Sequence, residues 1–67
     1  MPIIRVELWK GRSEQTKRAL ATDITNAVIT HVGCPVDAVT VIFDEIPKEN
    51  WVIGGQFCNE LFKDPGK

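Results

Sequence analysis

The sequence has few of the residues that small proteins use for cross-links or metal sites. Its 67 residues include two cysteines, Cys34 and Cys58, and one histidine, His31. A single histidine and two cysteines without ligand spacing are too few for a zinc site, so we expect no bound metal. The N-terminus shows no secretory signal, so we expect both thiols to stay reduced rather than to form a disulfide.

The sequence also lacks an excess of positive charge and any long apolar run. Eight Lys and Arg residues are spread along the chain against nine Asp and Glu, which gives a formal net charge of −1. A nucleic-acid-binding surface needs a basic patch that neutralises phosphates, so we expect no nucleic-acid partner. No segment approaches the roughly 20 apolar residues of a membrane-spanning helix. We therefore expect a soluble, cytoplasmic protein with no membrane partner.

The length of the chain predicts a single domain, residues 1–67, that is too small to be robust alone. A domain of this size buries only about 60% of the surface that its unfolded chain exposes. Such domains usually rely on disulfides, a metal or a partner chain, and the first two are not expected here. The sequence therefore predicts self-assembly.

The residues after Met1 predict a strand from Pro2 to Trp9. Alternate positions place four apolar residues on one face: Pro2, Ile4, Val6 and Leu8. The other face combines two apolar residues with two charged ones: Ile3, Arg5, Glu7 and Trp9. Because Ile3 and Trp9 are large and apolar, we expect something to cover this second face as well.

Capping residues predict a helix from about Glu14 to Val32. Ser13 is a good N-cap, and the negative charge at the first helical residue suits the positive end of the helix dipole. His31 falls in the last turn, Gly33 suits a left-handed residue after the helix, and Pro35 prevents continuation. Apolar residues recur at helical spacing along this segment: Leu20, Ile24, Ala27, Val28 and Val32.

The rest of the chain predicts a second strand and a hairpin. The β-branched segment Ala38–Phe43 is typical of a buried strand, and Pro47–Asn50 is typical of a turn. Residues Trp51–Phe57 form an extended piece with a bend at Gly54–Gly55, and we expect residues 62–67 to be a frayed tail. Strand, helix and strand in this order make a right-handed β-α-β unit with parallel strands. The predicted fold class is α/β, with a single β-α-β unit plus a short C-terminal β-hairpin.

A two-stranded parallel sheet with one covering helix is an incomplete architecture. One face of the sheet and both edges stay open, although parallel sheets are seldom exposed on a face and bare edges pair with other strands. Sheets that extend across a two-fold axis and pack face to face would remove both problems. We therefore expect oligomerisation to complete the fold.

Most groups with catalytic potential have a better structural explanation. His31 has no paired hydroxyl for a Ser-His-Asp triad, and nothing obvious near Cys34 would activate it as a nucleophile. Asp44 and Glu45 are neighbours on a strand, so they point to opposite faces and form no carboxylate dyad. Gly54–Gly55 is too short for a phosphate-binding loop.

Three residues keep a functional interpretation beside a structural one. Pro2 is either a strand opener or, once Met1 is removed as we expect, a secondary amine that can act as a base. An α-amino group has a pKa of roughly 7.7–8.0, which an apolar site or a nearby cation lowers. Arg12, in the loop before the helix, either binds a carboxylate through its fork or stays solvated. Trp51 either lines a pocket or anchors a core or an interface.

A series of short motifs runs through most of the chain: Pro2, Gly11-Arg12-Ser13, Glu14-Gln15, Lys17, Leu20, Ile24, Pro35, Val39, Val41, Glu45 and Trp51-Val52-Ile53-Gly54-Gly55. In this order and spacing they resemble the 4-oxalocrotonate tautomerase family. The resemblance extends from Pro2 to about Leu61. It implies a hexamer described as a trimer of dimers, and an isomerase that needs no cofactor and serves aromatic catabolism.

The resemblance also implies a mechanism and assigns residues to it. The neutral amine of Pro2 takes a proton from a small dienol or enol acid. It returns the proton to a more distant carbon, which gives the conjugated ketone. Arg12, generally from a neighbouring subunit, binds a substrate carboxylate. Trp51 stands where the family has an aromatic residue, usually phenylalanine, that lines the pocket.

One position departs from the family pattern. Well-studied members have a second arginine on the second strand, where this chain has Thr40. A threonine hydroxyl can donate a hydrogen bond, but it offers neither a charge nor a fork. Losing such a contact costs on the order of 10²–10³ in rate. Efficient turnover of the dicarboxylate 2-hydroxymuconate is therefore not expected, and a monocarboxylate or phenyl-substituted enol is an equal candidate.

Two alternatives remain open. A retained Met1 would turn the proline amine into an amide, and together with Thr40 this favours a weak or inactive binding oligomer on the same scaffold. A related dehalogenase would need a carboxylate to activate water. The residues beside Trp51, Val52 and Ile53, are apolar, so the sequence supports this second alternative less.

Overall fold

The computed structural model describes residues 2–62. Met1, whose removal we expect, lies outside this range, and so does the predicted tail except for its first residue, Phe62. The Phe62 amide donates a hydrogen bond to the Cys58 carbonyl at 2.8 Å. Its own carbonyl accepts one from Lys48 Nζ at 2.7 Å. Phe62 is therefore held by two backbone contacts and does not belong to a frayed tail.

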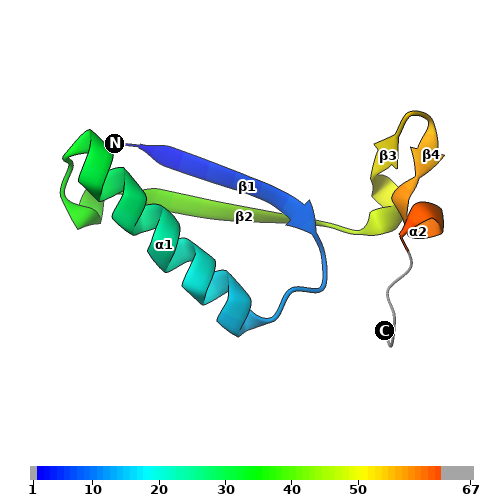
Figure 1. Cartoon of the computed structure of the whole chain (residues 1–67), viewed down its shortest axis with the longest axis horizontal. Coiled ribbons are helices and arrows are strands. Elements are labelled where there is room, and N and C mark those ends of the chain that lie inside the picture. Colours follow the sequence, from blue (N-terminus) through cyan, green and yellow to red (C-terminus); the bar gives the residue numbers. More distant parts are fainter. Residues whose placement is uncertain (1, 63–67) are drawn as a thin grey trace.

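The core of the fold is one β-α-β unit (Figure 1). Strand β1, Ile3–Trp9, is followed by helix α1, Glu14–Val32, and strand β2, Thr40–Ile46. The two strands pair in parallel over their full length, in a register that runs from Ile3 opposite Thr40 to Trp9 opposite Ile46. The predicted fold class, including the parallel strands and the later hairpin, is confirmed.

Helix α1 begins and ends where its capping residues predict. Ser13 has an extended backbone, and its hydroxyl accepts a hydrogen bond from the Thr16 amide at 3.1 Å. This satisfies one of the free N–H groups of the first turn. Gly33 follows the helix with φ of 83°, and its amide donates to the Ile29 carbonyl at 3.0 Å. A left-handed residue is easiest for glycine, which explains the sharp end of the helix.

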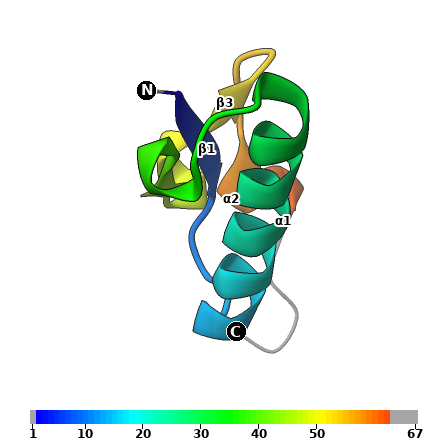
Figure 2. The ribbon, with the colours of Figure 1, turned by 90° about the vertical axis from the view of Figure 1, so that its left-hand side faces the viewer.

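Helix α1 lies along one face of the strands, and within residues 2–62 no second long helix lies on the other side (Figure 2). The half-buried helix positions follow an i, i+4 stripe: Lys17, Leu20, Ala21, Ile24, Thr25, Val28 and Ile29. Two residues predicted to share this apolar side, Ala27 and Val32, are exposed, Val32 to 65%. An i, i+4 row is inclined to the helix axis, so the contact stripe ends near Ile29.

The second strand lies later in the sequence than predicted. The expected strand Ala38–Phe43 is wrong at both ends, because Val36–Ala38 forms a 3₁₀ turn and β2 is Thr40–Ile46. The Val39 amide donates to the Val36 carbonyl at 3.2 Å, which closes this turn. The strand continues to Ile46 because β1 offers seven residues for pairing, a tertiary partner that local composition does not reveal.

Residues 47–62 leave the sheet as a C-terminal arm (Figure 1). The predicted turn is a 3₁₀ turn, Lys48–Asn50, and the predicted extended piece is a hairpin of β3, Val52–Ile53, and β4, Gln56–Phe57. The bend at Gly54–Gly55 has φ of 58° and 82°, the left-handed values that a tight two-residue hairpin requires. A short helix that the sequence did not predict, α2, Cys58–Leu61, completes the arm.

The isolated chain buries very little. Among the described residues only Cys58 is buried, and the radius of gyration is 15.0 Å. A compact domain of this length would have about 11 Å. Large apolar side chains are exposed both near the start of the sheet and on the arm: Ile3, Val32, Val36, Val52, Ile53, Phe57, Leu61 and Phe62. None of the helices within residues 2–62 is long and apolar enough to cross a membrane.

Candidate functional site

Pro2 and Thr40 lie together where the two strands begin. The Thr40 amide donates a hydrogen bond to the Pro2 carbonyl at 3.1 Å. Pro2 is half-buried and Thr40 is exposed. Thr40 pairs with Ile3, so its side chain shares the face of the sheet that α1 does not cover. The structure thus brings together two of the four predicted site residues.

Arg12 lies beyond the opposite end of β1. The strand spans seven residues, Ile3–Trp9, which corresponds to about 20 Å between its first and last Cα atoms. Arg12 follows in the loop before α1, and its side chain is exposed. Within one chain, therefore, Pro2 and Arg12 do not form a common site. A site that contains both needs a second chain.

Trp51 also lies on the far side, at the base of the arm. Its ring meets the ring of Trp9 edge to face, with centroids 5.9 Å apart and an interplanar angle of 77°. Its carbonyl accepts a hydrogen bond from the Cys58 amide at 2.8 Å. Trp51 therefore anchors the arm within its own chain. It is only half-buried, and its predicted pocket-lining role stays a prediction.

Trp9 is the centre of an aromatic cluster that the sequence analysis did not assign to the site. Phe62 packs against its ring at 5.3 Å between centroids, and Lys48 Nζ lies 4.7 Å from the centroid of the same ring. The indole nitrogen of Trp9 is buried and finds no hydrogen-bond partner among residues 2–62. The only signal in the sequence was the large apolar residue on a partly charged strand face. The arm covers Trp9, whereas Ile3 at the other end of the same face, which was also expected to be covered, stays exposed.

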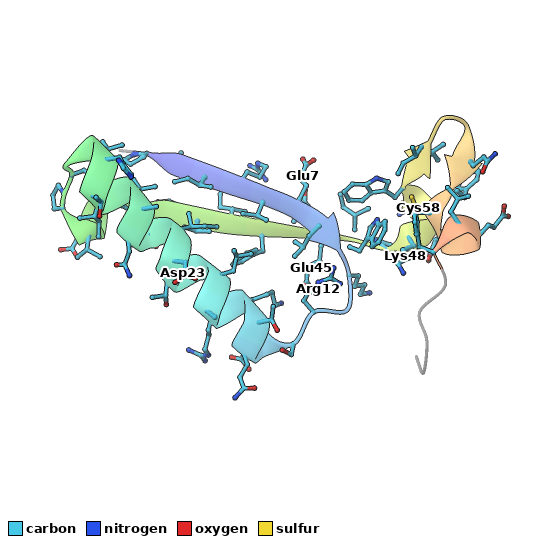
Figure 3. All side chains as sticks on the ribbon, in the orientation of Figure 1. Glu7, Arg12, Asp23, Glu45, Lys48 and Cys58 are labelled. Carbon is cyan, nitrogen blue, oxygen red and sulfur yellow. The ribbon has the colours of Figure 1, made fainter. Side chains whose placement is uncertain are left out.

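A second feature missed from the sequence is an ion pair beside the Arg12 loop. Lys17 Nζ of α1 lies 2.7 Å from Glu45 Oε2 of β2, and both side chains are about 30% exposed, at 30% and 28%. Figure 3 shows Glu45 and Arg12 at the same end of the sheet, with Lys48 and Cys58 on the arm next to it. Asp44 is exposed, which agrees with the expected opposite orientation of the two carboxylates.

His31 and the two cysteines form no further candidate site among the described residues. His31 lies in the last turn of α1, Cys34 is half-buried and Cys58 is buried, and both thiols are free. Within the described part of the chain, no three acidic, His or Cys side chains are grouped as metal ligands.

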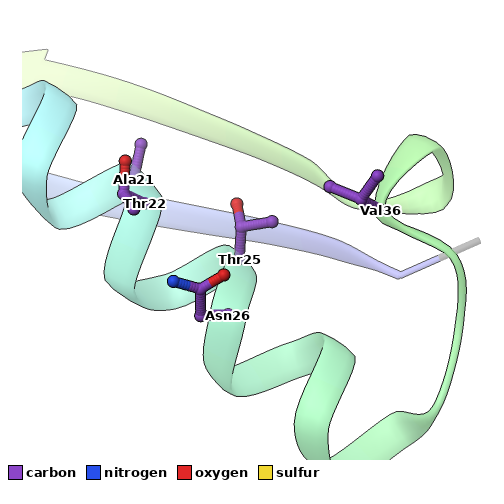
Figure 4. A pocket seen from close by; sticks show the side chains of 5 residues that line it. All are labelled: Ala21, Thr22, Thr25, Asn26 and Val36. Atoms are coloured by element: carbon purple, nitrogen blue, oxygen red, sulfur yellow. The ribbon is translucent and has the colours of Figure 1, made fainter.

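One open hollow lies between α1 and the 3₁₀ turn Val36–Ala38 (Figure 4). Its lining is Ala21, Thr22, Thr25, Asn26 and Val36. None of these side chains ionises near neutral pH, so the hollow offers no acid or base, and it contains none of the predicted site residues. The hollow therefore gives no alternative to the predicted site residues, Pro2, Arg12, Thr40 and Trp51.

Comparison with known proteins identifies the family of the chain. The family model for tautomerase enzymes matches residues 2–60. A 2-hydroxymuconate tautomerase of Comamonas testosteroni is 39% identical over 61 residues, which cover 91% of this chain and 97% of the relative.

Solved structures show the same fold. TomN, a 4-oxalocrotonate tautomerase homologue in the tomaymycin biosynthetic pathway, has a TM-score of 0.88 at 44% identity, over 96% of this chain and 98% of that one. A heterohexamer 4-oxalocrotonate tautomerase from Chloroflexus aurantiacus has a TM-score of 0.85 at 31% identity, over 91% and 98% of the two chains. The chain therefore belongs to the 4-oxalocrotonate tautomerase family of the tautomerase superfamily, and it is an isomerase of the keto–enol type.

Proposed function

We propose that this enzyme is a cofactor-independent tautomerase of small 2-hydroxy-dienoate or enol carboxylates, with the amine of Pro2 as its base. The observation that carries the proposal is the position of Pro2, half-buried at the head of β1, at the residue where the family match begins. A base on the first rigid element of a fold is held in one orientation. Removal of Met1 creates the secondary amine that the mechanism uses.

The proposed reaction is a proton transfer within one substrate. The neutral Pro2 amine takes the proton of the enol hydroxyl, and the electron pair moves through the conjugated system toward a distant carbon. The resulting ammonium group then gives the proton to that carbon, which leaves a conjugated ketone and regenerates the neutral base. An amine whose pKa lies near the working pH suits both halves of this exchange.

Arg12 and Trp51 enter this site from another subunit. The Arg12 guanidinium binds the substrate carboxylate through two parallel hydrogen bonds. The half-buried ring of Trp51 keeps the surroundings of the amine apolar, which favours its neutral form. Because Pro2 and Arg12 of one chain lie at opposite ends of β1, the active site of this proposal forms only between chains.

The proposed assembly is a homo-oligomer, a hexamer arranged as a trimer of dimers. The open sheet face, the single buried residue among those described and the exposed apolar side chains of the arm all support it. A related chain from Chloroflexus aurantiacus forms a heterohexamer. We place the enzyme in the cytoplasm as one domain spanning the chain, with small enol acids, not nucleic acid or membrane, as partners. A role in aromatic catabolism belongs to the same proposal.

The proposed substrate carries one carboxylate. Thr40 stands beside Pro2 and offers a hydroxyl without a charge, so a second carboxylate of the substrate finds no cation from this position. A phenyl-substituted enol such as phenylenolpyruvate fits this site better than the dicarboxylate 2-hydroxymuconate. The same observation favours a second candidate, a scaffold that binds such acids with weak or no turnover.

Kinetics on these two enols separate the candidates. Intact-mass spectrometry first confirms that the preparation lacks Met1, because an amide nitrogen is no base. The enzyme is then compared with Pro2→Ala and with a chain whose N-terminal amine is acetylated. The tautomerase predicts a loss of roughly 10²–10⁴-fold in kcat/KM for the acetylated chain, the usual range for a general base. Equal turnover by native and acetylated chains would remove Pro2 from the mechanism.

A further inference from the structure

Both ends of the loop that carries Arg12 are attached to the last two residues of β2. At the start of this Arg12 loop, residues 10–13, the Lys10 amide donates to the Ile46 carbonyl at 2.9 Å. Just after the loop, Lys17 Nζ pairs with Glu45 Oε2 at 2.7 Å. The adjacent residues Glu45 and Ile46 thus fix the loop from one strand end.

Arg12 itself has no comparable attachment. Within residues 2–62 its guanidinium makes no hydrogen bond or ion pair, and its side chain is exposed. Gly11 precedes it with φ of 118°, a conformation that residues with a side chain rarely adopt. The direction of Arg12 is therefore set by the two ends of the loop rather than by contacts of its own.

The Lys17–Glu45 pair is suited to fix the second end. The Lys17 amide donates to the Ser13 carbonyl at 3.2 Å, and Ser13 is the residue directly after Arg12. A restraint on Lys17 therefore reaches Arg12 through one backbone hydrogen bond and one peptide unit. The pair also joins two elements, α1 and β2, so it holds the first turn of the helix against the sheet.

A neighbouring pair shows the difference between this contact and an ordinary surface ion pair. Arg18 Nη2 and Glu14 Oε2 are also 2.7 Å apart, but their side chains are 75% and 77% exposed and both belong to α1. Exposed pairs of this kind contribute little. The Lys17–Glu45 side chains are less than a third exposed, so water screens their attraction less.

We propose that Glu45 and Lys17 are positioning residues that hold the Arg12 loop in the orientation in which Arg12 binds the substrate carboxylate of a neighbouring subunit. The inference rests on the proposed function through the role of Arg12. A guanidinium fork binds a carboxylate well only when both are aligned, so a displaced loop weakens binding of the substrate. Neither Glu45 nor Lys17 touches the substrate.

The test compares Glu45→Gln, which keeps the shape and removes the charge, with Glu14→Gln as the matched control. With phenylenolpyruvate we expect Glu45→Gln to raise KM roughly 3–10-fold while kcat stays within about twofold, a coupling in the range measured for residues of one network. Glu14→Gln breaks an ion pair of equal length in the same region of the helix and leaves both constants unchanged.

A double-mutant cycle identifies Arg12 as the residue through which Glu45 acts. In an Arg12→Ala background the same Glu45→Gln change should have no further effect on KM. Reversing the pair with Lys17→Glu and Glu45→Lys should restore KM to within about twofold of the native value. Circular dichroism and sedimentation of every variant confirm that the oligomer is intact. An equal rise in KM in the Arg12→Ala background, or in Glu14→Gln, overturns the proposal.

A binding experiment keeps this inference separate from the proposed reaction. Quenching of tryptophan fluorescence by cinnamate, an unreactive phenyl-substituted carboxylate, measures the dissociation constant without turnover. Glu45→Gln should weaken cinnamate binding by the same 3–10-fold factor only where Arg12 is present. If Pro2 is not the base, Glu45→Gln still weakens cinnamate binding only in chains that contain Arg12. If Glu45 does not position Arg12, Glu45→Gln leaves cinnamate binding unchanged or weakens it equally without Arg12, while blocking Pro2 still lowers turnover.

Discussion

Pro2 and Arg12 of one chain lie at opposite ends of the seven-residue strand β1. A side chain of arginine cannot bridge the roughly 20 Å that such a strand spans. If both residues act in one reaction, as proposed, they come from two different chains. The proposed mechanism therefore predicts that two inactivating variants, one in each residue, can complement each other in a mixed oligomer.

Mixed oligomers should be more active than either parent alone. Pro2→Ala and Arg12→Ala chains, each weak alone, are unfolded together and reassembled in equal amounts. If each site takes Pro2 from one chain and Arg12 from another at random, about a quarter of the sites contain both native residues. We expect turnover of phenylenolpyruvate near a quarter of the native value. A mixture no more active than its parents would place both residues in one chain's site.

Charged side chains on the open face of the sheet should affect the stability of the oligomer. Glu7 lies directly opposite Asp44, and Arg5 is two residues before Glu7 on the same face. All three are exposed, and within residues 2–62 none of them forms an ion pair. Like charges directly opposite on adjacent strands are destabilising, by roughly 0.2–1 kcal/mol. A cation from a second copy of the chain, such as Arg5 of that copy, would offset this repulsion between Glu7 and Asp44.

Arg5→Glu should therefore shift the oligomer toward smaller species. Analytical ultracentrifugation across a range of protein concentrations measures the change. Arg18→Glu is the control, because Arg18 is exposed on α1 and away from this face. An unchanged oligomer in Arg5→Glu would show that this face is not an interface held by charge. Loss of activity should accompany dissociation, since the proposed site forms between chains.

Activity should rise with pH as the Pro2 amine loses its proton. The neutral amine is the proposed base, so kcat/KM is low below its pKa and reaches a plateau above it. An ordinary α-amino group has a pKa of roughly 7.7–8.0, and an apolar pocket with a nearby arginine lowers that value. We expect a midpoint at or below this range. A rate that falls as pH rises from about 6 to 8 would contradict a neutral amine base.

The sequence predicts the elements whose signals are local. Ser13 at one end of α1 and Gly33 with Pro35 at the other mark the helix to the residue, because capping depends on near neighbours. The end of β2 was predicted too early, since Asp44–Ile46 joins the strand only through pairing with β1. Helix α2 is one turn long and is supported by the burial of Cys58, which is a tertiary property.

The same distinction applies to the candidate site. Pro2, Arg12, Thr40 and Trp51 were identified because each matches, or departs from, a motif at a fixed place in the chain. The Lys17–Glu45 pair and the contacts of Trp9 join residues far apart in sequence, and the spacing of residues in the sequence does not predict such contacts. The distance between Pro2 and Arg12 in one chain follows from the length of the strand between them, whereas the neighbouring subunit was expected from the family resemblance alone.

Thr40→Arg should extend the substrate range to dicarboxylates. Thr40 is exposed, and its contact with Pro2 is made by its backbone amide, so a longer side chain can be introduced without removing that hydrogen bond. A guanidinium at this position adds a charge and a fork beside the base. We expect kcat/KM for 2-hydroxymuconate to rise by roughly 10–10²-fold, somewhat less than the 10²–10³ that a native contact of this kind supplies. The value for phenylenolpyruvate should change little, because that substrate has no second carboxylate for the new arginine to bind.

Thr40→Val separates the effect of charge from the loss of the hydroxyl. Valine keeps the β-branched shape that suits a strand, and it removes only the hydrogen-bonding group. If the hydroxyl already assists the reaction, this variant loses activity on both enols, whereas Thr40→Arg gains on the dicarboxylate alone. Steady-state kinetics on the two substrates with all three proteins measure this selectivity. A Thr40→Arg enzyme that gains nothing on 2-hydroxymuconate would mean that the side chain at this position points away from the bound substrate.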